Sequence, residues 1–122
     1  MESGGERRHF ERDVPIHAEP VLAHELKEGK AYFSVQFLDE DLLLPLVETL
    51  VFTGRGFDED GLKVLYFQDI SSYQLRIERD SPEAERAKFY EKHEKDLKHI
   101  FEYERALDRL IDCSLRRQKR DR

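Results

Sequence analysis

The chain of 122 residues lacks the features that mark secreted and membrane proteins. Its single cysteine, Cys113, cannot form a disulfide within the chain and is compatible with a reducing compartment. No apolar run approaches the roughly 18 residues that cross a bilayer as a helix. The first residues also lack the apolar core of a secretory signal. We therefore expect a cytoplasmic protein that does not associate with membranes.

Motifs that identify enzymes are also missing. The sequence contains no Gly-x-Ser-x-Gly nucleophile elbow and no His-Glu-x-x-His zinc motif. The histidines are scattered, and His93 and His99 would lie about 240° apart around a helix axis. Cys113 falls near the C-terminal end of a predicted helix, where the helix dipole raises the pKa of a thiol. We therefore expect a protein that is not an enzyme and that holds no metal or cofactor.

The segment 53–61 contains three glycines and three acidic residues, a composition that occurs in phosphate and metal loops. The segment does not match any of three known binding-loop motifs, because each motif needs a different residue at one or more positions. Leu62 stands where a P-loop needs lysine, and Glu59 stands where a dinucleotide fingerprint needs glycine. An EF-hand loop would need oxygen ligands at Gly56 and Phe67. Since apolar runs flank the segment and it ends in Asp-Gly, it predicts the turn of a β-hairpin.

The first two thirds of the chain favour an antiparallel sheet. Residues 1–13 are charged and have no apolar period, so we expect a disordered lead there. Residues 14–80 form the predicted β domain, because apolar and β-branched residues alternate within it. The predicted strands number four or five, and the sheet is either open or curled into a partial barrel. They fall at 21–26, 31–38, 46–53, 62–67 and, as the fifth, 73–78.

The last third predicts one long helix over residues 81–117. Ser81 and Pro82 are typical of a helix start, and glycine and proline are absent from the residues that follow. With Ser81 as the cap, the 36 residues from Pro82 to Arg117 would be about 54 Å long as a helix, whereas a domain of this size is about 35 Å across. The fold class is therefore α+β, with a small antiparallel sheet followed by a C-terminal helix that overhangs it.

The overhang predicts an interface. A sheet of short strands covers only about half of such a helix, and exposed apolar patches mark sites of association. We expect two copies to pack with these helices antiparallel, as a homodimer or other homo-oligomer. The alternative is a kinked helix that folds back on its own chain. The predicted interface residues are Leu97, Phe101, Leu107, Leu110 and Ile111.

The chain ends in a basic tail, predicted at residues 118–122 and preceded by two arginines. Residues 116–122 carry a charge of +4, whereas the whole chain carries −6, so the remainder carries −10. The candidate contact residues are Arg116, Arg117, Lys119 and Arg120. The sequence favours a protein-interaction module that self-associates through its helix. Binding of nucleic acid or an acidic partner by the tail is the alternative, and a solvated terminus is the simpler explanation of the tail.

Overall fold

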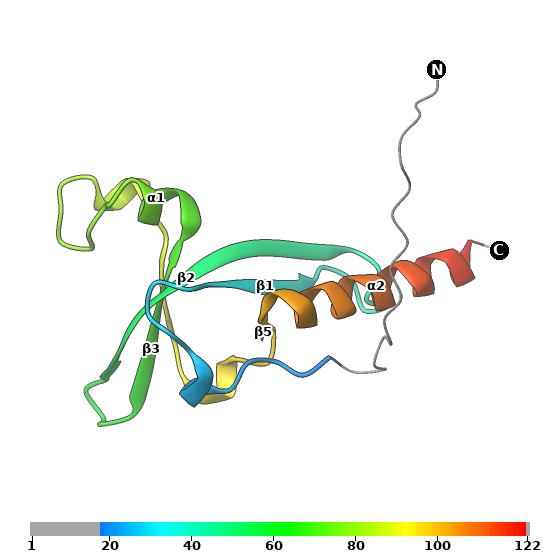
Figure 1. Cartoon of the computed structure of the whole chain (residues 1–122), viewed down its shortest axis with the longest axis horizontal. Coiled ribbons are helices and arrows are strands. Elements are labelled where there is room, and N and C mark those ends of the chain that lie inside the picture. The colour runs from blue at the N-terminus through cyan, green and yellow to red at the C-terminus, as the bar shows by residue number, and fades with distance from the viewer. Residues whose placement is uncertain (1–17, 122) are drawn as a thin grey trace, which may run out of the picture.

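The structure is a computed structural model, and it describes residues 18–121. It has an α+β fold, in which an open five-stranded antiparallel sheet is followed by a C-terminal helix (Figure 1). The strand order across the sheet is β4-β3-β2-β1-β5. The strands are β1 (Ala31–Phe37), β2 (Pro45–Phe57), β3 (Lys63–Asp69), β4 (Phe89–Lys92) and β5 (Ile100–Phe101). The helices are α1 (Ile70–Gln74) and α2 (Tyr103–Arg120), and the 3-10 turns are Ala23–Glu25, Ala84–Arg86 and Glu94–Asp96.

The predicted turn within 53–61 is confirmed as the hairpin between β2 and β3. The carboxylate of Asp58 accepts hydrogen bonds from the amides of Asp60 and Leu62, both at 2.9 Å. Gly61 has a φ of 79°, a conformation that glycine adopts without the steric cost of a side chain. Gly54 lies at an irregularity in the β2–β3 pairing, where the register shifts between Phe52 and Gly54. The glycines of this segment therefore shape the hairpin.

The chain reaches the two edge strands by crossing one face of the sheet. After β3, α1 begins at Asp69, whose side chain accepts a hydrogen bond from the amide of Ser72. β4 then pairs with β3, and the chain passes through the turn Glu94–Asp96 to β5, which pairs with β1 at the opposite edge. Figure 1 shows α2 lying along β1, while α1 lies at the other end of the molecule.

Both faces of the sheet are covered near β1, which explains why alternate residues of that strand are buried on each side. One face carries Tyr32, Leu50, Phe52, Leu65 and Phe67, and Val21, Leu26, Leu97 and Ile100 pack against it. The other face carries Val35 and Phe101, and Ala106 and Leu110 of α2 pack there. Aromatic and β-branched residues suit both faces, because they pack well on a pleated surface.

The predicted helix over 81–117 is wrong in its first part. Residues 81–102 contain β4, β5 and two 3-10 turns, and α2 begins only at Tyr103. Local propensity favoured a helix there, but the apolar pairs 89–90 and 100–101 belong to the sheet, so tertiary packing decides. With 18 residues, α2 is about 27 Å long. It is therefore comparable to the sheet in length, and the predicted overhang of nearly 20 Å is absent.

Two predicted strands are also wrong. The 21–26 segment forms a 3-10 turn, and 73–78 lies at the end of α1 and the loop after it. Arg76 in that loop has a φ of 59°, which a regular strand does not accommodate. The total of five strands holds because β4 and β5 replace these two. The predicted lead at 1–13 lies outside the described residues.

Candidate functional site

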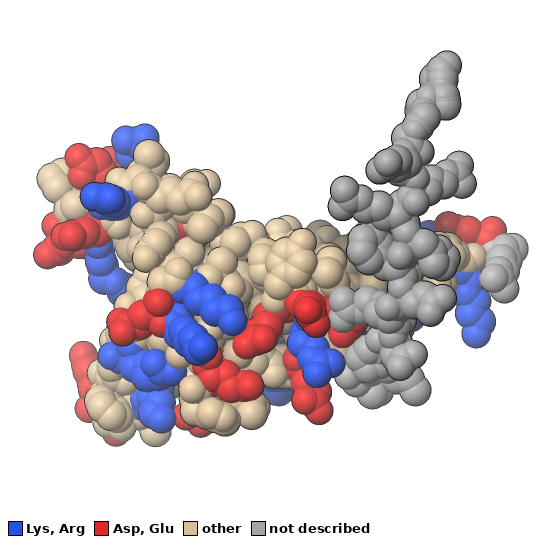
Figure 2. Space-filling view, in the orientation of Figure 1, with Lys and Arg blue, Asp and Glu red and all other residues tan. Residues whose placement is uncertain are grey.

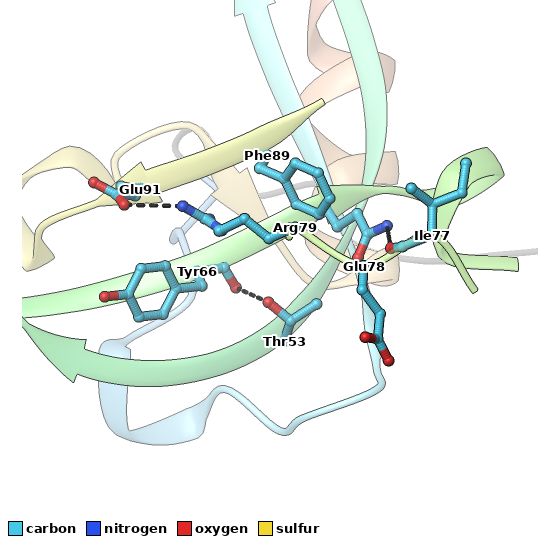
Figure 3. Close-up of a pocket in the computed structure, with 8 residues that line it drawn as sticks. Thr53, Tyr66, Ile77, Glu78, Arg79, Phe89 and Glu91 are labelled. Carbon is cyan, nitrogen blue, oxygen red and sulfur yellow. Dashed lines mark hydrogen bonds and ion pairs between the residues drawn. The ribbon is translucent and has the colours of Figure 1, made fainter. Parts of the chain in front are cut away.

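A pocket opens on the sheet between β3, β4 and the segment 77–79 (Figure 3). Its volume is about 390 Å³. The guanidinium group of Arg79 lies over the rings of Tyr66 and Phe89, 5.2 Å from each centroid. It also pairs with the carboxylate of Glu91 at 3.0 Å. The residues that line the pocket are Thr53, Tyr66, Gln68, Ile77, Glu78, Arg79, Phe89 and Glu91.

The geometry of this pocket favours a structural joint over a reaction centre. Arg79 already occupies the ring faces on which a cationic ligand would stack, and Glu91 balances its charge. The hydroxyl of Thr53 donates to the carbonyl of Tyr66 at 3.2 Å, so it is held by the backbone. Arg79 therefore ties the loop after α1 to β3 and β4.

A buried polar network also holds the loop after α1 in place. The amide nitrogen of Gln68 donates to the hydroxyl of Ser72 and to the carbonyl of Ile77, each at 2.9 Å. Asp69 accepts hydrogen bonds from the amides of Ser72 and Lys88, at 3.0 and 2.8 Å. Burial raises the pKa of Asp69, but the hydrogen bonds from Lys88 and Ser72 outweigh it and hold the pKa below its ordinary value. These contacts fix α1 and the start of β4 to β3.

A second polar contact joins the β2–β3 hairpin to the segment that crosses the sheet. His93 Nε2 lies 3.0 Å from a carboxylate oxygen of Asp58. This bond, together with the amide of Leu62, holds the pKa of Asp58 below its ordinary value. His99 lies elsewhere, and burial lowers its pKa. Within residues 18–121 no three histidine, cysteine or acidic side chains gather in a way that suits a metal ion.

The structure separates the predicted interface residues into two groups. Leu97 and Phe101 are 4% and 2% exposed, and they belong to the two cores of this chain. Their assignment to an external helix face is wrong, because they precede α2 and complete the sheet packing. Leu107, Leu110 and Ile111 do lie on α2. Leu107 is 37% exposed, whereas Leu110 and Ile111 are half-buried.

One side of α2 faces the beginning of β2. A hollow of about 310 Å³ lies between Pro45 on the strand and Leu110 and Ser114 on the helix, and the buried Cys113 also borders it. Leu107 lies one turn before Leu110 on this side of the helix. We call Leu107, Leu110 and Ser114 the β2-facing side of α2.

The basic residues at the end of the chain are part of α2 through Arg120, so the predicted separate tail at 118–122 is wrong. Arg116 is held against the body: it pairs with Asp112, donates to the carbonyl of Leu42 at 3.1 Å and lies over the ring of Phe37. Arg120 pairs with Asp121 at 3.2 Å. Arg117 and Lys119 are exposed. The four residues therefore do not form one continuous basic surface.

Sequence reasoning missed a free edge on β2. The amide of Phe52 donates to Lys30 at 3.1 Å and its carbonyl accepts from Gly29 at 2.8 Å, so its backbone faces the β1 side. Backbone direction alternates along a strand, and Val47 and Thr49 therefore face the β3 side. However, β3 pairs with β2 only from Leu50 onward.

Within the described part of the chain, Val47 and Thr49 consequently have no neighbouring strand on that side. The chain turns into α1 after Asp69, so α1 rather than a strand follows β3 beside this length of β2. We call residues 45–49 the free edge of β2. The sequence carries no signal of it, because it follows from the mismatch between a 13-residue β2 and a 7-residue β3, which the pairing register shows.

The chain matches no known family model, no curated protein and no solved structure, so its function is argued from its own geometry. Among residues 18–121, none of the helices combines the length and the apolar character that crossing a bilayer requires.

Proposed function

We propose that this protein is a non-enzymatic interaction module that forms a homodimer through the β2-facing side of α2. The observation that carries the proposal is an apolar surface where α2 meets the beginning of β2. Leu107 on the helix is 37% exposed, and Val47 on the strand, whose side chain lies on the same face of the sheet as α2, is 44% exposed. Contiguous exposed apolar surface is typical of association sites.

The charge distribution supports this choice of surface. In Figure 2 the upper edge of the molecule along β2 is mostly uncharged, whereas acidic and basic side chains crowd the lower part of the view. The chain as a whole carries −6, so two copies repel one another at long range. A surface nearly free of charge is where two such copies approach with the smallest electrostatic cost.

The difference in exposure between Ala106 and Leu107 supports an interface on α2, because one side of the helix packs on the sheet and Leu107 on another side does not. Ala106 packs in the core between α2 and the sheet, and Cys113 and Asp108 of the same helix are also buried. Leu107 follows Ala106 but lies about 100° further round the axis, so it is left out of that packing. A partner that covers Leu107 would remove its apolar area from water, at about 25 cal/mol per Å².

Matched variants test the proposal. We expect Leu107→Glu to weaken dimerisation at least about tenfold, because it places a charge in the contact. Leu115 serves as the control: it is 52% exposed on the same helix, about 80° from Leu107 and about 140° from Leu110 around the axis, and thus further from β2. Leu115→Glu should leave the dimer intact. Sedimentation velocity measures both, and loss of the dimer in Leu115→Glu alone would contradict the choice of surface.

Binding of nucleic acid or an acidic partner at the end of α2 is the second candidate function. It is supported only by the exposure of Arg117 and Lys119, since Arg116 and Arg120 already pair with Asp112 and Asp121. Its signature would be salt-dependent binding to a mixed oligonucleotide that is lost in the double variant Arg117→Glu, Lys119→Glu.

A further inference from the structure

We propose that the pocket between β3, β4 and the segment 77–79 binds an arginine side chain of another protein, and that Arg79 occupies it as an intramolecular substitute. The structure shows how a guanidinium group fits there. Arg79 lies over the rings of Tyr66 and Phe89 and pairs with the carboxylate of Glu91 (Figure 3). Aromatic faces and a carboxylate are the partners that guanidinium groups bind best. The pocket shares no residue with the β2-facing side of α2, so this site is independent of the proposed dimer.

The lining of the pocket selects a cation once the side chain of Arg79 has moved away. The other charged side chains of the lining are the carboxylates of Glu78 and Glu91, and the faces of the two rings carry negative partial charge. The chain as a whole carries −6, which attracts a basic segment of a partner. An anion would meet two carboxylates. The two ring faces favour the flat guanidinium of arginine over the compact ammonium of lysine.

A buried acceptor at the pocket is left over by Arg79. Gln68 is only 6% exposed, and its amide nitrogen donates to the hydroxyl of Ser72 and to the carbonyl of Ile77, each at 2.9 Å. Because a carbonyl only accepts, these bonds fix which end of the carboxamide is nitrogen. Within residues 18–121 the side-chain oxygen of Gln68 has no hydrogen-bond partner, and Gln68 borders the pocket. A guanidinium has five N–H groups, so a ligand can donate to this oxygen as well as to Glu91.

Arg79 is held weakly enough to exchange with a ligand. Its side chain is 49% exposed and that of Glu91 is 57% exposed, and ion pairs with this much solvent around them contribute little to stability. Arg79 lies on the connection 75–88 between α1 and β4, where Ile77 is buried and anchors the backbone. The side chain of Arg79 can therefore leave without unfolding the connection. The cavity of about 390 Å³ is within the range of small-ligand sites.

Binding of N-acetyl-arginine methylamide to the variant Arg79→Ala tests the proposal. We expect this probe to bind the variant several-fold more tightly than it binds the unmodified chain, because the intramolecular competitor is gone. The control ligand is N-acetyl-citrulline methylamide, which has nearly the same shape and no charge. The control variant is Arg86→Ala, since Arg86 is exposed on the same connection and does not line the pocket. Titration followed by NMR measures each affinity.

Tighter binding of the arginine probe to Arg79→Ala, with weaker binding once Glu91→Gln is added, supports the site. Equal affinity for the arginine and citrulline probes overturns it, and so does a folded Arg79→Ala variant that does not bind the arginine probe. If Arg79→Ala does not fold, the unmodified chain provides the test. The Nε–H signal of Arg79 should then move toward that of a free arginine as the probe is added, and a signal that stays in place overturns the proposal.

Discussion

Asp69 is the residue on which the loop region most depends. Its carboxylate begins α1 by accepting from Ser72, and it holds the start of β4 by accepting from Lys88. An aspartate, serine or threonine at a helix start is readable from sequence. The second bond is not, because it joins residues 19 positions apart in the chain.

Replacing Asp69 should therefore cost more than an ordinary helix cap. We expect Asp69→Ala to lower the free energy of unfolding by about 1–3 kcal/mol, because two backbone amides lose their acceptor. Asp80 is exposed, and Asp80→Ala should change it by less than about 0.5 kcal/mol. Urea denaturation of the two variants measures the difference. Equal effects would show that the hydrogen bonds of Asp69 contribute nothing specific.

Asp58 should affect how the free energy of unfolding depends on pH in the acid range. Its pKa in the folded protein lies below its ordinary value, first because of the hydrogen bond with His93. The resulting stabilisation is present above about pH 4, the unfolded pKa of aspartate, and is lost as the pH falls through the lower folded pKa. We expect Asp58→Asn to reduce this loss between about pH 4 and pH 2.

Asp60 provides the control for that experiment, since its carboxylate has no hydrogen-bond partner in the described part of the chain. Asp60→Asn should keep the pH dependence of the unmodified protein. The measurement is the free energy of unfolding as a function of pH. If Asp58→Asn loses as much unfolding free energy below about pH 4 as the unmodified protein, the contact between Asp58 and His93 does not contribute to the pH dependence.

At the scale of elements, the sequence predicted what depends on local pattern. The alternation in 31–38 and the β-branched residues in 46–53 identified β1 and β2, and Asp60-Gly61 identified the hairpin between β2 and β3. It failed where local preference and tertiary packing disagree. Residues 81–102 are rich in helix formers, but Phe89, Tyr90, Ile100 and Phe101 gain more by joining the sheet.

The reassignment of Leu97 and Phe101 from an interface to the core has a measurable consequence. Leu97→Ala should destabilise the fold by about 2–5 kcal/mol, because it removes a buried side chain of the core that also contains Ile100 and Phe67. The matched change Leu115→Ala, at an exposed position of α2, should cost less than about 1 kcal/mol. Thermal or urea unfolding compares them. Similar small effects would mean that Leu97 is not a core residue.

At the scale of the whole molecule, the candidate site was only partly readable. Leu107, Leu110 and Ile111 were identified from their spacing and do lie on α2. The reason first given for an interface, a helix much longer than its domain, does not hold. The free edge of β2 depends on where β3 stops and α1 begins, and this follows from pairing register rather than from residue type.

The most direct test of self-association is the mass of the unmodified chain in solution over a range of concentration. Sedimentation equilibrium from low to high micromolar protein measures it. We predict a reversible transition to twice the mass of the single chain. A constant single-chain mass across the whole range would contradict the proposed interaction module.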